Sequence, residues 1–164
     1  MALLDWIDPT RGWPVVEGPA PDLDGPTLQV TAMPFGQGLE SARVLGRPER
    51  FEWHSRIHKD CDLLYASKGL RLSFKQGRLT TLAFLIGRGA CDHPKFAPAQ
   101  PLAPNGTRLG PTMDRAQIVA LFGEPDPKGS DETVLQVFHR CGVISDFWLD
   151  EKGRLQEWSL YPDD

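Results

Sequence analysis

Apolar and polar residues alternate along six short segments of the chain, and this is the pattern of half-buried β-strands. The first half of the chain carries three such segments, at residues 62–67, 70–75 and 79–86. Residues 51–53 are a candidate for a fourth strand in this half. The second half carries the other three, at residues 133–140, 143–149 and 155–161. Glycines lie between neighbouring segments, because tight hairpin turns need the positive φ that glycine adopts freely. The pattern therefore predicts antiparallel hairpins in both halves.

A short helix is predicted ahead of each group of strands. In the second half, Thr112 is the expected N-cap, and Asp114 lies in the first turn, where it favours the positive end of the helix dipole. Gly123 and Pro125 end this helix, because glycine suits the C′ position and proline prevents continuation. In the first half, residues 38–45 give a weaker helical pattern that ends in the same Gly-x-Pro spacing.

The period of two predicts which side chains of the strands share a face. The buried face is expected to hold the apolar set Leu70, Leu72, Phe74, Leu82, Phe84, Ile86, Val143, Phe147, Leu149, Trp158 and Leu160. The opposite face is expected to be open and mostly polar, with Arg71, Ser73, Lys75, Thr81, Ala83, Asp146, Trp148, Glu157, Ser159 and Tyr161. We expect the helices to cover only the buried face.

Four short anchors occur in the same order in both halves, which predicts an internal duplication. One pair is Leu45-Gly46-Arg47-Pro48 and, 77 positions later, Phe122-Gly123-Glu124-Pro125. The expected fold class is α+β, with two tandem copies of a short helix followed by an antiparallel β-meander and with the helices packed on one face of the sheet. The expected domains are an extended N-terminal arm at 1–30, a first repeat at 31–86, a Pro/Gly-rich linker at 87–111 and a second repeat at 112–164.

The segment from Gly110 to Pro125 resembles the helix opening of the small lipoproteins of the bacterial outer-membrane barrel-assembly machinery. In that family a Gly, a Met and a Thr open a helix, and Leu-Gly-x-Pro closes it. Two such units in tandem also resemble the beta-lactamase inhibitor proteins, whose helices lie on one side of a sheet and whose open face grips a partner. The resemblance implies a binding module by analogy of fold alone. The chain has no lipobox, and no inhibitory loop can be matched, so the resemblance implies no particular target.

Composition and charge narrow the classes of function. The chain has 164 residues, 40% of them hydrophobic and 24% charged, which fits one globular domain of ordinary size. It has no apolar run long enough to span a membrane, and its N-terminus lacks the regions of a secretory signal. A net charge of −4 with no basic block argues against nucleic acid as a partner. Three irregularly spaced cysteines favour a reducing compartment, so we expect a cytoplasmic protein of bacterial type.

Histidine and cysteine gather at three places, which raises a metal-binding or enzymatic interpretation. The clusters are His54 and His58 near Cys61, Cys91 near His93, and His139 near Cys141. None has the Cys-x-x-Cys spacing of a structural zinc site, so we predict no metal, cofactor or catalytic residue. The run Cys91-Asp92-His93 holds triad chemistry, but triads are assembled in space rather than by sequence neighbours. A small-ligand or metal-binding protein that uses these clusters, and an enzyme with a cleft between the repeats, stay open as alternatives.

The open face carries the residues that we expect to bind. Aromatic residues are enriched at interface hot spots, and burial of Phe147 and Leu149 leaves Trp148 on the open face. The predicted binding residues are Trp148, Tyr161, Trp53, Arg71, Asp146 and Glu157. We therefore expect a non-enzymatic protein-binding module of inhibitor, immunity or adaptor type whose acidity favours a basic partner protein. Two alternatives remain: the protein forms a homodimer, or the N-terminal arm covers this face through Trp6 or Trp13.

Overall fold

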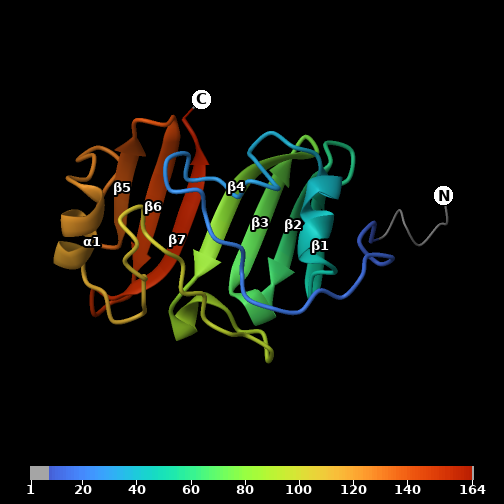
Figure 1. The fold of residues 1–164 in the computed structure, drawn as a ribbon, viewed down its shortest axis with the longest axis horizontal. Helices are drawn as coiled ribbons and strands as arrows, with labels where there is room; N and C mark the ends of the chain where they lie inside the picture. The colour runs from blue at the N-terminus through green and yellow to red at the C-terminus, as the bar shows by residue number, and fades with distance from the viewer. Residues whose placement is uncertain (1–7, 164) are drawn as a thin grey trace.

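The computed structural model describes residues 8–163 and contains one antiparallel sheet of seven strands (Figure 1). The first half of the chain forms β1 (Arg50–Ser55), β2 (Asp60–Tyr65), β3 (Leu70–Lys75) and β4 (Arg78–Leu85). The second half forms β5 (Val134–His139), β6 (Val143–Leu149) and β7 (Leu155–Pro162). The strand order is β1-β2-β3-β4-β7-β6-β5, so two meanders meet where β4 pairs with β7.

The predicted fold class is wrong. Two tandem units of a helix and a meander were expected, whereas one continuous sheet dominates the structure and the helices are few and short. Within residues 8–163 the only helix of α type is α1 (Arg115–Phe122), and the first predicted helix is instead the 3₁₀ helix η1 (Leu39–Leu45). The N-cap of η1 is Gly38, which has no side chain to accept a hydrogen bond from the first turn. Two single-turn 3₁₀ helices, η2 (Ala66–Lys68) and η3 (Arg88–Ala90), lie in connections.

Helix α1 begins two residues later than predicted, because Asp114 rather than Thr112 is its N-cap. The Asp114 carboxylate accepts a hydrogen bond from the Gln117 N–H at 3.0 Å, and the Gln117 side chain accepts one from the Asp114 N–H at 3.0 Å. This reciprocal pair is a capping box. The carbonyl of Met113 accepts a hydrogen bond from the Leu155 N–H at 2.9 Å, so the residues before α1 are tied to β7.

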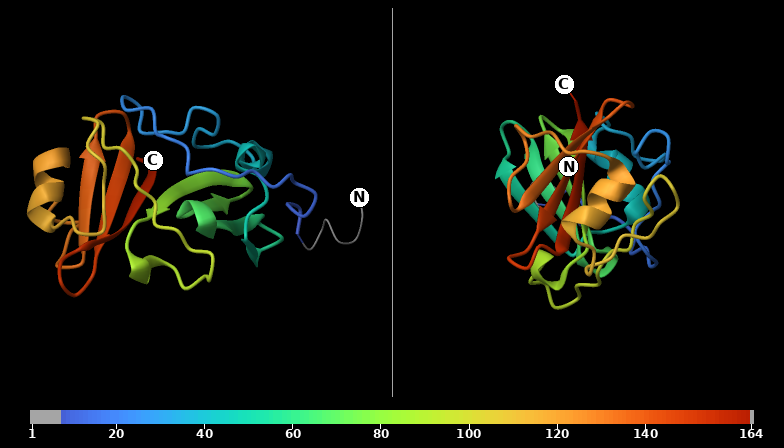
Figure 2. Two further views of the ribbon diagram at one scale, coloured as in Figure 1. Left: turned by 60° about the horizontal axis from the view of Figure 1, so that its bottom comes forward. Right: turned by 90° about the vertical axis from the view of Figure 1, so that its left-hand side faces the viewer.

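The predicted alternation of faces is confirmed on the buried side. All eleven apolar residues assigned to it are at most 8% exposed. The N-terminal arm, η1 and α1 lie together on this side of the sheet, as the end-on view shows (Figure 2). They add Trp13, Met33, Leu45 and Ile118 to the same core, along with Leu109 from the connection between the meanders. The arm, η1 and α1 therefore cover one face of the sheet, whereas the other face is open apart from Leu64 and Leu85, which pack against Ala90, Cys91 and Phe96.

Strands β4 and β7 join the two meanders through their buried side chains. Leu82 lies opposite Leu160, and Phe84 lies opposite Trp158. The rings of Phe84 and Trp158 stack with centroids 5.6 Å apart, and Trp158 stacks on Phe147 of β6 at 5.7 Å. Because these aromatic residues are almost fully buried, one apolar layer runs unbroken across the junction.

The connection between the meanders is docked onto the turn between β2 and β3 at Gly69. The Leu85 N–H donates to the Gly69 carbonyl at 2.8 Å, and the Ala99 N–H donates to the Leu85 carbonyl at 2.9 Å. Gly69 has φ 60° and ψ 40°, a left-handed conformation that favours glycine. A Cβ at this position would also collide with the backbone of Ala97 and Ala99. Gly69 is therefore required both for its backbone conformation and for this close approach.

We expect Gly69→Ala to destabilise the fold more than Gly142→Ala, although both glycines have similar positive φ values, 60° and 74°. An added Cβ at Gly142 meets nothing within 4 Å, so this variant measures the cost of backbone strain alone. Gly142→Ala should lower the free energy of unfolding by about 1–2 kcal/mol. Gly69→Ala should lower it by about 2–5 kcal/mol, because the connection must also move. Urea unfolding measures both, and equal losses would contradict the docking of residues 97–99.

Candidate functional site

Side chains on the open face form rows across the sheet, because paired residues of neighbouring strands point to the same side. One row contains Gln136, Asp146 and Ser159, and it continues through Ala83 to Arg71. The rows on either side contain Phe138, Ile144 and Tyr161, and Val134, Trp148 and Glu157. Five of the six predicted binding residues therefore surround one shallow hollow of about 410 Å³. Its lining is Arg71, Thr81, Asp146, Trp148, Glu157, Ser159 and Tyr161.

Trp148 is the large apolar residue at this hollow. Its neighbours Phe147 and Leu149 point into the core, and Trp148 is 46% exposed. The N-terminal arm does not cover it through Trp13, because Trp13 is buried in the core on the opposite side of the sheet. Trp6, the other tryptophan considered for this cover, lies outside the described residues. A half-exposed indole on a strand presents a rigid apolar surface of the kind that is enriched at interfaces.

Gln136, Asp146 and Tyr161 hold one another in fixed positions. The Gln136 amide donates to Asp146 Oδ1 at 3.1 Å and to the Tyr161 hydroxyl at 2.7 Å, and that hydroxyl donates to Asp146 Oδ2 at 2.9 Å. Burial and the hydrogen bond to Asp146 raise the pKa of Tyr161 to about 12, so the phenol stays protonated at neutral pH. Gln136 was not among the predicted binding residues; its position opposite Asp146 becomes evident only when β5 and β6 are paired.

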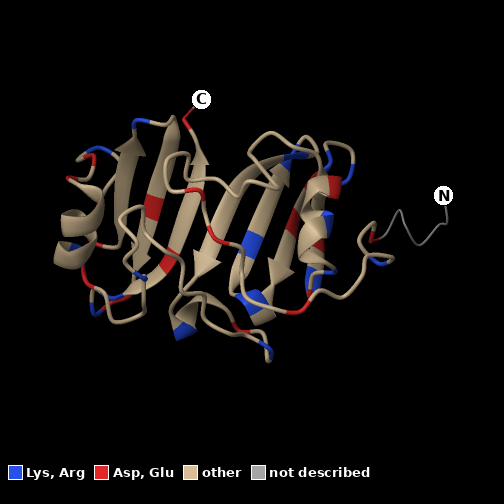
Figure 3. Ribbon diagram, in the orientation of Figure 1, with Lys and Arg blue, Asp and Glu red and all other residues tan. Residues whose placement is uncertain are grey.

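Arg71 and Glu157 form an ion pair that crosses the junction of the two meanders. Arg71 Nη2 lies 2.8 Å from Glu157 Oε1, and the Ser159 hydroxyl donates to the same oxygen at 2.6 Å. The Glu157 side chain is 13% exposed and the Arg71 side chain 40%, so the pair is partly desolvated. Charges are sparse on these strands: β6 and β7 carry one acidic residue each, Asp146 and Glu157 (Figure 3). The hollow therefore holds two carboxylates and one guanidinium.

Trp53 lies on the opposite face of the sheet from the other five predicted binding residues. It pairs with Cys61, whose side chain is buried in the core, and the rings of Trp53 and Phe51 meet edge to face with their centroids 5.0 Å apart. The period of two places Phe51 and Trp53 together on the covered side of β1. The open face instead carries Phe138, which is 50% exposed and was missed by the sequence analysis.

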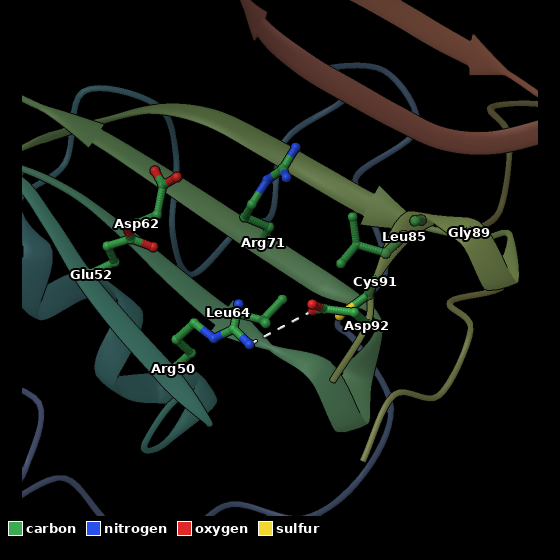
Figure 4. A pocket seen from close by; sticks show the side chains of 10 residues that line it. Arg50, Glu52, Asp62, Leu64, Arg71, Leu85, Gly89, Cys91 and Asp92 are labelled. Atoms are coloured by element: carbon green, nitrogen blue, oxygen red, sulfur yellow. Dashed lines mark ion pairs between the residues drawn. The ribbon is translucent and has the colours of Figure 1, made fainter. Parts of the chain in front are cut away.

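A second hollow, of about 360 Å³, lies on the same face over β1, β2 and β3 (Figure 4). Residues 89–92 form one wall of it, and Arg50 lies 3.7 Å from Asp92 there. Arg71 lines both hollows, so its ion pair with Glu157 stands between them. The carboxylates of Glu52 and Asp62 lie on neighbouring strands at the other end.

His54 lies beside this hollow and contacts one of the two carboxylates, that of Asp62. His54 Nε2 is 2.9 Å from Asp62 Oδ2, and this hydrogen bond raises the pKa of His54. Because the His54 side chain is 51% exposed, solvent screens the interaction and its effect on stability is small.

The three histidine and cysteine clusters do not converge. Cys61 is buried in the core, where desolvation raises the pKa of its thiol to about 12, and Cys141 is exposed in the turn between β5 and β6. Cys91 and Asp92 line the second hollow, whereas His93 lines a different one. Within residues 8–163 there is no group of three or more His, Cys, Asp or Glu residues that could hold a metal ion.

A serine–histidine pair occurs on the covered face, and its role is structural. Ser145 Oγ lies 2.7 Å from His139 Nε2 and accepts a hydrogen bond from Trp158 Nε1 at 2.9 Å. A nucleophile must reach its substrate, but Ser145 is completely buried. Desolvation lowers the pKa of His139, so the imidazole is neutral and can accept the hydrogen of the Ser145 hydroxyl. The pair satisfies the indole N–H of Trp158 inside the core.

Comparison with protein families, with curated proteins and with solved structures finds no match to this chain. The resemblance to the barrel-assembly lipoproteins and the beta-lactamase inhibitor proteins therefore stays a prediction. In the part of the chain that the structure describes, no helix is long and apolar enough to cross a membrane. The function has to be argued from the site itself.

We expect a double-mutant cycle on Arg71→Met and Glu157→Gln to give a coupling free energy of about 1–2 kcal/mol, because Glu157 is mostly desolvated. The matched control is the exposed pair Arg50 and Asp92, whose side chains are 50% and 89% exposed. Arg50→Met with Asp92→Asn should give a coupling within about 0.5 kcal/mol of zero. Urea unfolding of the single and double variants measures both, and similar couplings would show that the Arg71–Glu157 pair is not rigidly held.

We expect His139 and His54 to make opposite contributions to the pH dependence of stability. Burial lowers the pKa of His139, so the unfolded chain takes up a proton below about pH 6.5 that the folded chain refuses, and stability falls on acidification. Asp62 raises the pKa of His54, so the folded chain takes up its proton first and gains stability that is lost as the pH rises through that value.

The free energy of unfolding can therefore be compared between about pH 7.5 and about pH 5.5 for wild type, His139→Gln and His54→Gln. His139→Gln should lose less stability than wild type over this interval, and His54→Gln should lose slightly more. A change of the same sign in both variants would contradict the assignment.

Proposed function

We propose that this protein is a non-enzymatic binding module whose open sheet face contacts the basic surface of another protein around Trp148. The observation that carries the proposal is a 46%-exposed tryptophan beside Asp146, a carboxylate already held in position by two internal hydrogen bonds. Side chains that are fixed before binding lose little conformational entropy when a partner arrives. The site therefore has the rigidity that a recognition surface on strands provides.

The distribution of exposed apolar residues supports this choice of surface. Trp148 and Phe138 lie on neighbouring strands of the open face, in the two rows on either side of the row that includes Asp146. Within residues 8–163, the other large exposed apolar residues lie on the arm, on η1 and in the turn between β1 and β2; they are Val15, Val16, Val44 and Ile57. Scattered apolar residues are normal on a surface, whereas two aromatic residues around a fixed polar centre are typical of an interface core.

Charge supports a basic partner. Asp146 and Glu157 face Arg71 across the hollow, so the site carries one negative charge in excess, and the chain as a whole carries −4. Such a field steers a basic surface toward the site and disfavours an acidic one. The inhibitor, immunity and adaptor roles all remain within this proposal, because each requires only a specific protein contact. The three free cysteines support a reducing compartment such as the cytoplasm.

The alternatives based on histidine and cysteine have less support. Their side chains are divided between the core, β1, the turns of two hairpins and the walls of two different hollows, so they do not gather around a common centre. The close pair of hydroxyl and imidazole formed by Ser145 and His139 is buried and closed to substrates. A cleft between the meanders would be needed for the enzymatic alternative, and the paired strands β4 and β7 occupy that position instead.

The test is affinity capture from an extract of the native cell with wild-type protein, Trp148→Ala and the control Ile57→Ala. Ile57 is 90% exposed, so its replacement removes apolar surface away from the proposed site. We expect a partner that is retained by wild type and by the control and is depleted about tenfold or more by Trp148→Ala, because truncating a hot-spot tryptophan costs about 2 kcal/mol or more.

The captured partner is then purified and titrated against the same three proteins by calorimetry. Binding that weakens with added salt and with Trp148→Ala supports a basic partner on the open face. A reconstituted partner that binds Trp148→Ala as tightly as wild type would place the interface elsewhere and overturn the proposal.

A further inference from the structure

We infer that the hollow beside Trp148 receives one arginine side chain of the partner, with its guanidinium group between the Trp148 ring and the Asp146 carboxylate. This inference rests on the proposed function and specifies the chemistry of its central contact. It assigns Trp148 and Asp146 as the residues that select arginine.

The charges that line the hollow would be balanced by a single additional cation. Of the two carboxylates that line it, Glu157 already has Arg71 at 2.8 Å. Asp146 receives hydrogen bonds from the neutral donors Gln136 and Tyr161, and within residues 8–163 it forms no ion pair. One positive side chain therefore completes the neutralisation of the site, whereas a second would meet Arg71 without a counter-charge.

The hydrogen bonding of Asp146 favours a guanidinium over a compact ammonium. Each carboxylate oxygen accepts one internal hydrogen bond, Oδ1 from Gln136 and Oδ2 from Tyr161. A carboxylate offers about four lone-pair sites, so each oxygen retains the capacity to accept one more. A forked donor that reaches both oxygens at once is the guanidinium of arginine. Because Gln136 and Tyr161 fix the carboxylate, its orientation is set before the partner arrives.

The surroundings supply the flat apolar contact that a guanidinium also uses. Trp148 and Asp146 lie two residues apart on β6 and point to the same side, so the exposed ring lies next to the carboxylate. Arginine stacks on aromatic faces and is more weakly hydrated than lysine, so it loses less when it enters a partly enclosed site. Because the adjoining side chains of Ser159 and Thr81 are small, the hollow of about 410 Å³ can accommodate one long side chain.

The protein itself already seats one arginine beside this hollow. Arg71 extends from β3 past the small Ala83 and reaches Glu157 on β7, where the Ser159 hydroxyl shares the same acceptor oxygen. Glu157 and Asp146 lie on neighbouring strands, on either side of Ser159, which pairs with Asp146. Asp146 therefore resembles Glu157: each carboxylate accepts a hydrogen bond from a hydroxyl group, that of Tyr161 or of Ser159. The guanidinium that Arg71 supplies to Glu157 would come to Asp146 from another molecule.

The test uses small blocked amino acids, so it does not depend on identifying the partner. The indole N–H resonance of Trp148 is followed by NMR while the full chain is titrated with N-acetyl-arginine amide, N-acetyl-lysine amide or N-acetyl-citrulline amide. Citrulline has nearly the shape of arginine without its charge. We expect saturable shifts with arginine in the millimolar range, weaker binding with lysine and no saturation with citrulline. Asp146→Asn should weaken arginine binding about tenfold or more, because it removes the charge but keeps the size of the side chain.

Ile57→Ala serves as the control, because Ile57 is 90% exposed in the turn between β1 and β2 and does not line the hollow. It should bind arginine amide as wild type does, and the dispersion of the amide resonances verifies that each variant is folded. Equal binding of citrulline and arginine, equal binding of lysine and arginine, or unchanged binding by Asp146→Asn would each overturn the inference. If arginine fails while the captured partner still requires Trp148, the proposed function stands and this inference alone falls.

Discussion

Leu82 of β4 pairs with Leu160 of β7, 78 positions later, and this pairing is the contact on which the rest of the structure depends. Each meander alone would leave a long edge strand unpaired and half of an aromatic layer exposed to water. The junction closes both edges and stacks Phe84 on Trp158 with the ring centroids 5.6 Å apart. The covering elements then need to protect only one face, because the other face is formed by strands whose outward side chains are mostly polar.

The geometry of the candidate site depends on the pairing of β4 with β7. Arg71 comes from β3 and Glu157 from β7, so their ion pair forms only when β4 lies between them. Asp146 is held from both sides, by Gln136 of β5 and by Tyr161 of β7. Each side chain is therefore fixed by a neighbouring strand rather than by a loop. This fixed polar centre, with Trp148 at its margin, distinguishes the open face from an ordinary solvated sheet surface.

The sequence allowed the faces of the sheet to be predicted but not the way in which the strands assemble. Alternation was sufficient to place Trp148 outside and Phe147 inside, because parity along one strand needs no partner. Gln136 and Phe138 were missed because their roles depend on register between strands, which a periodic pattern does not encode. Trp53 was grouped with the other aromatic residues, although its parity with Phe51 places it on the covered side. The two similar halves suggested tandem units of a helix and a meander, and only the pairing of β4 with β7 shows that both meanders form one sheet.

The pairing of β4 with β7 joins strands that are far apart in the sequence, and this affects the order in which the chain folds. Neighbouring strands within each meander are close in sequence, so their contacts cost little loop-closure entropy, whereas the contact between β4 and β7 closes a much longer loop. Arg71 is synthesised long before the carboxylates of Asp146 and Glu157 exist. A nascent, truncated or half-folded chain thus displays part of the surface without its charge balance. The proposed recognition at this face would therefore require the completely folded chain, and a partner bound there would discriminate folded molecules from incompletely folded ones.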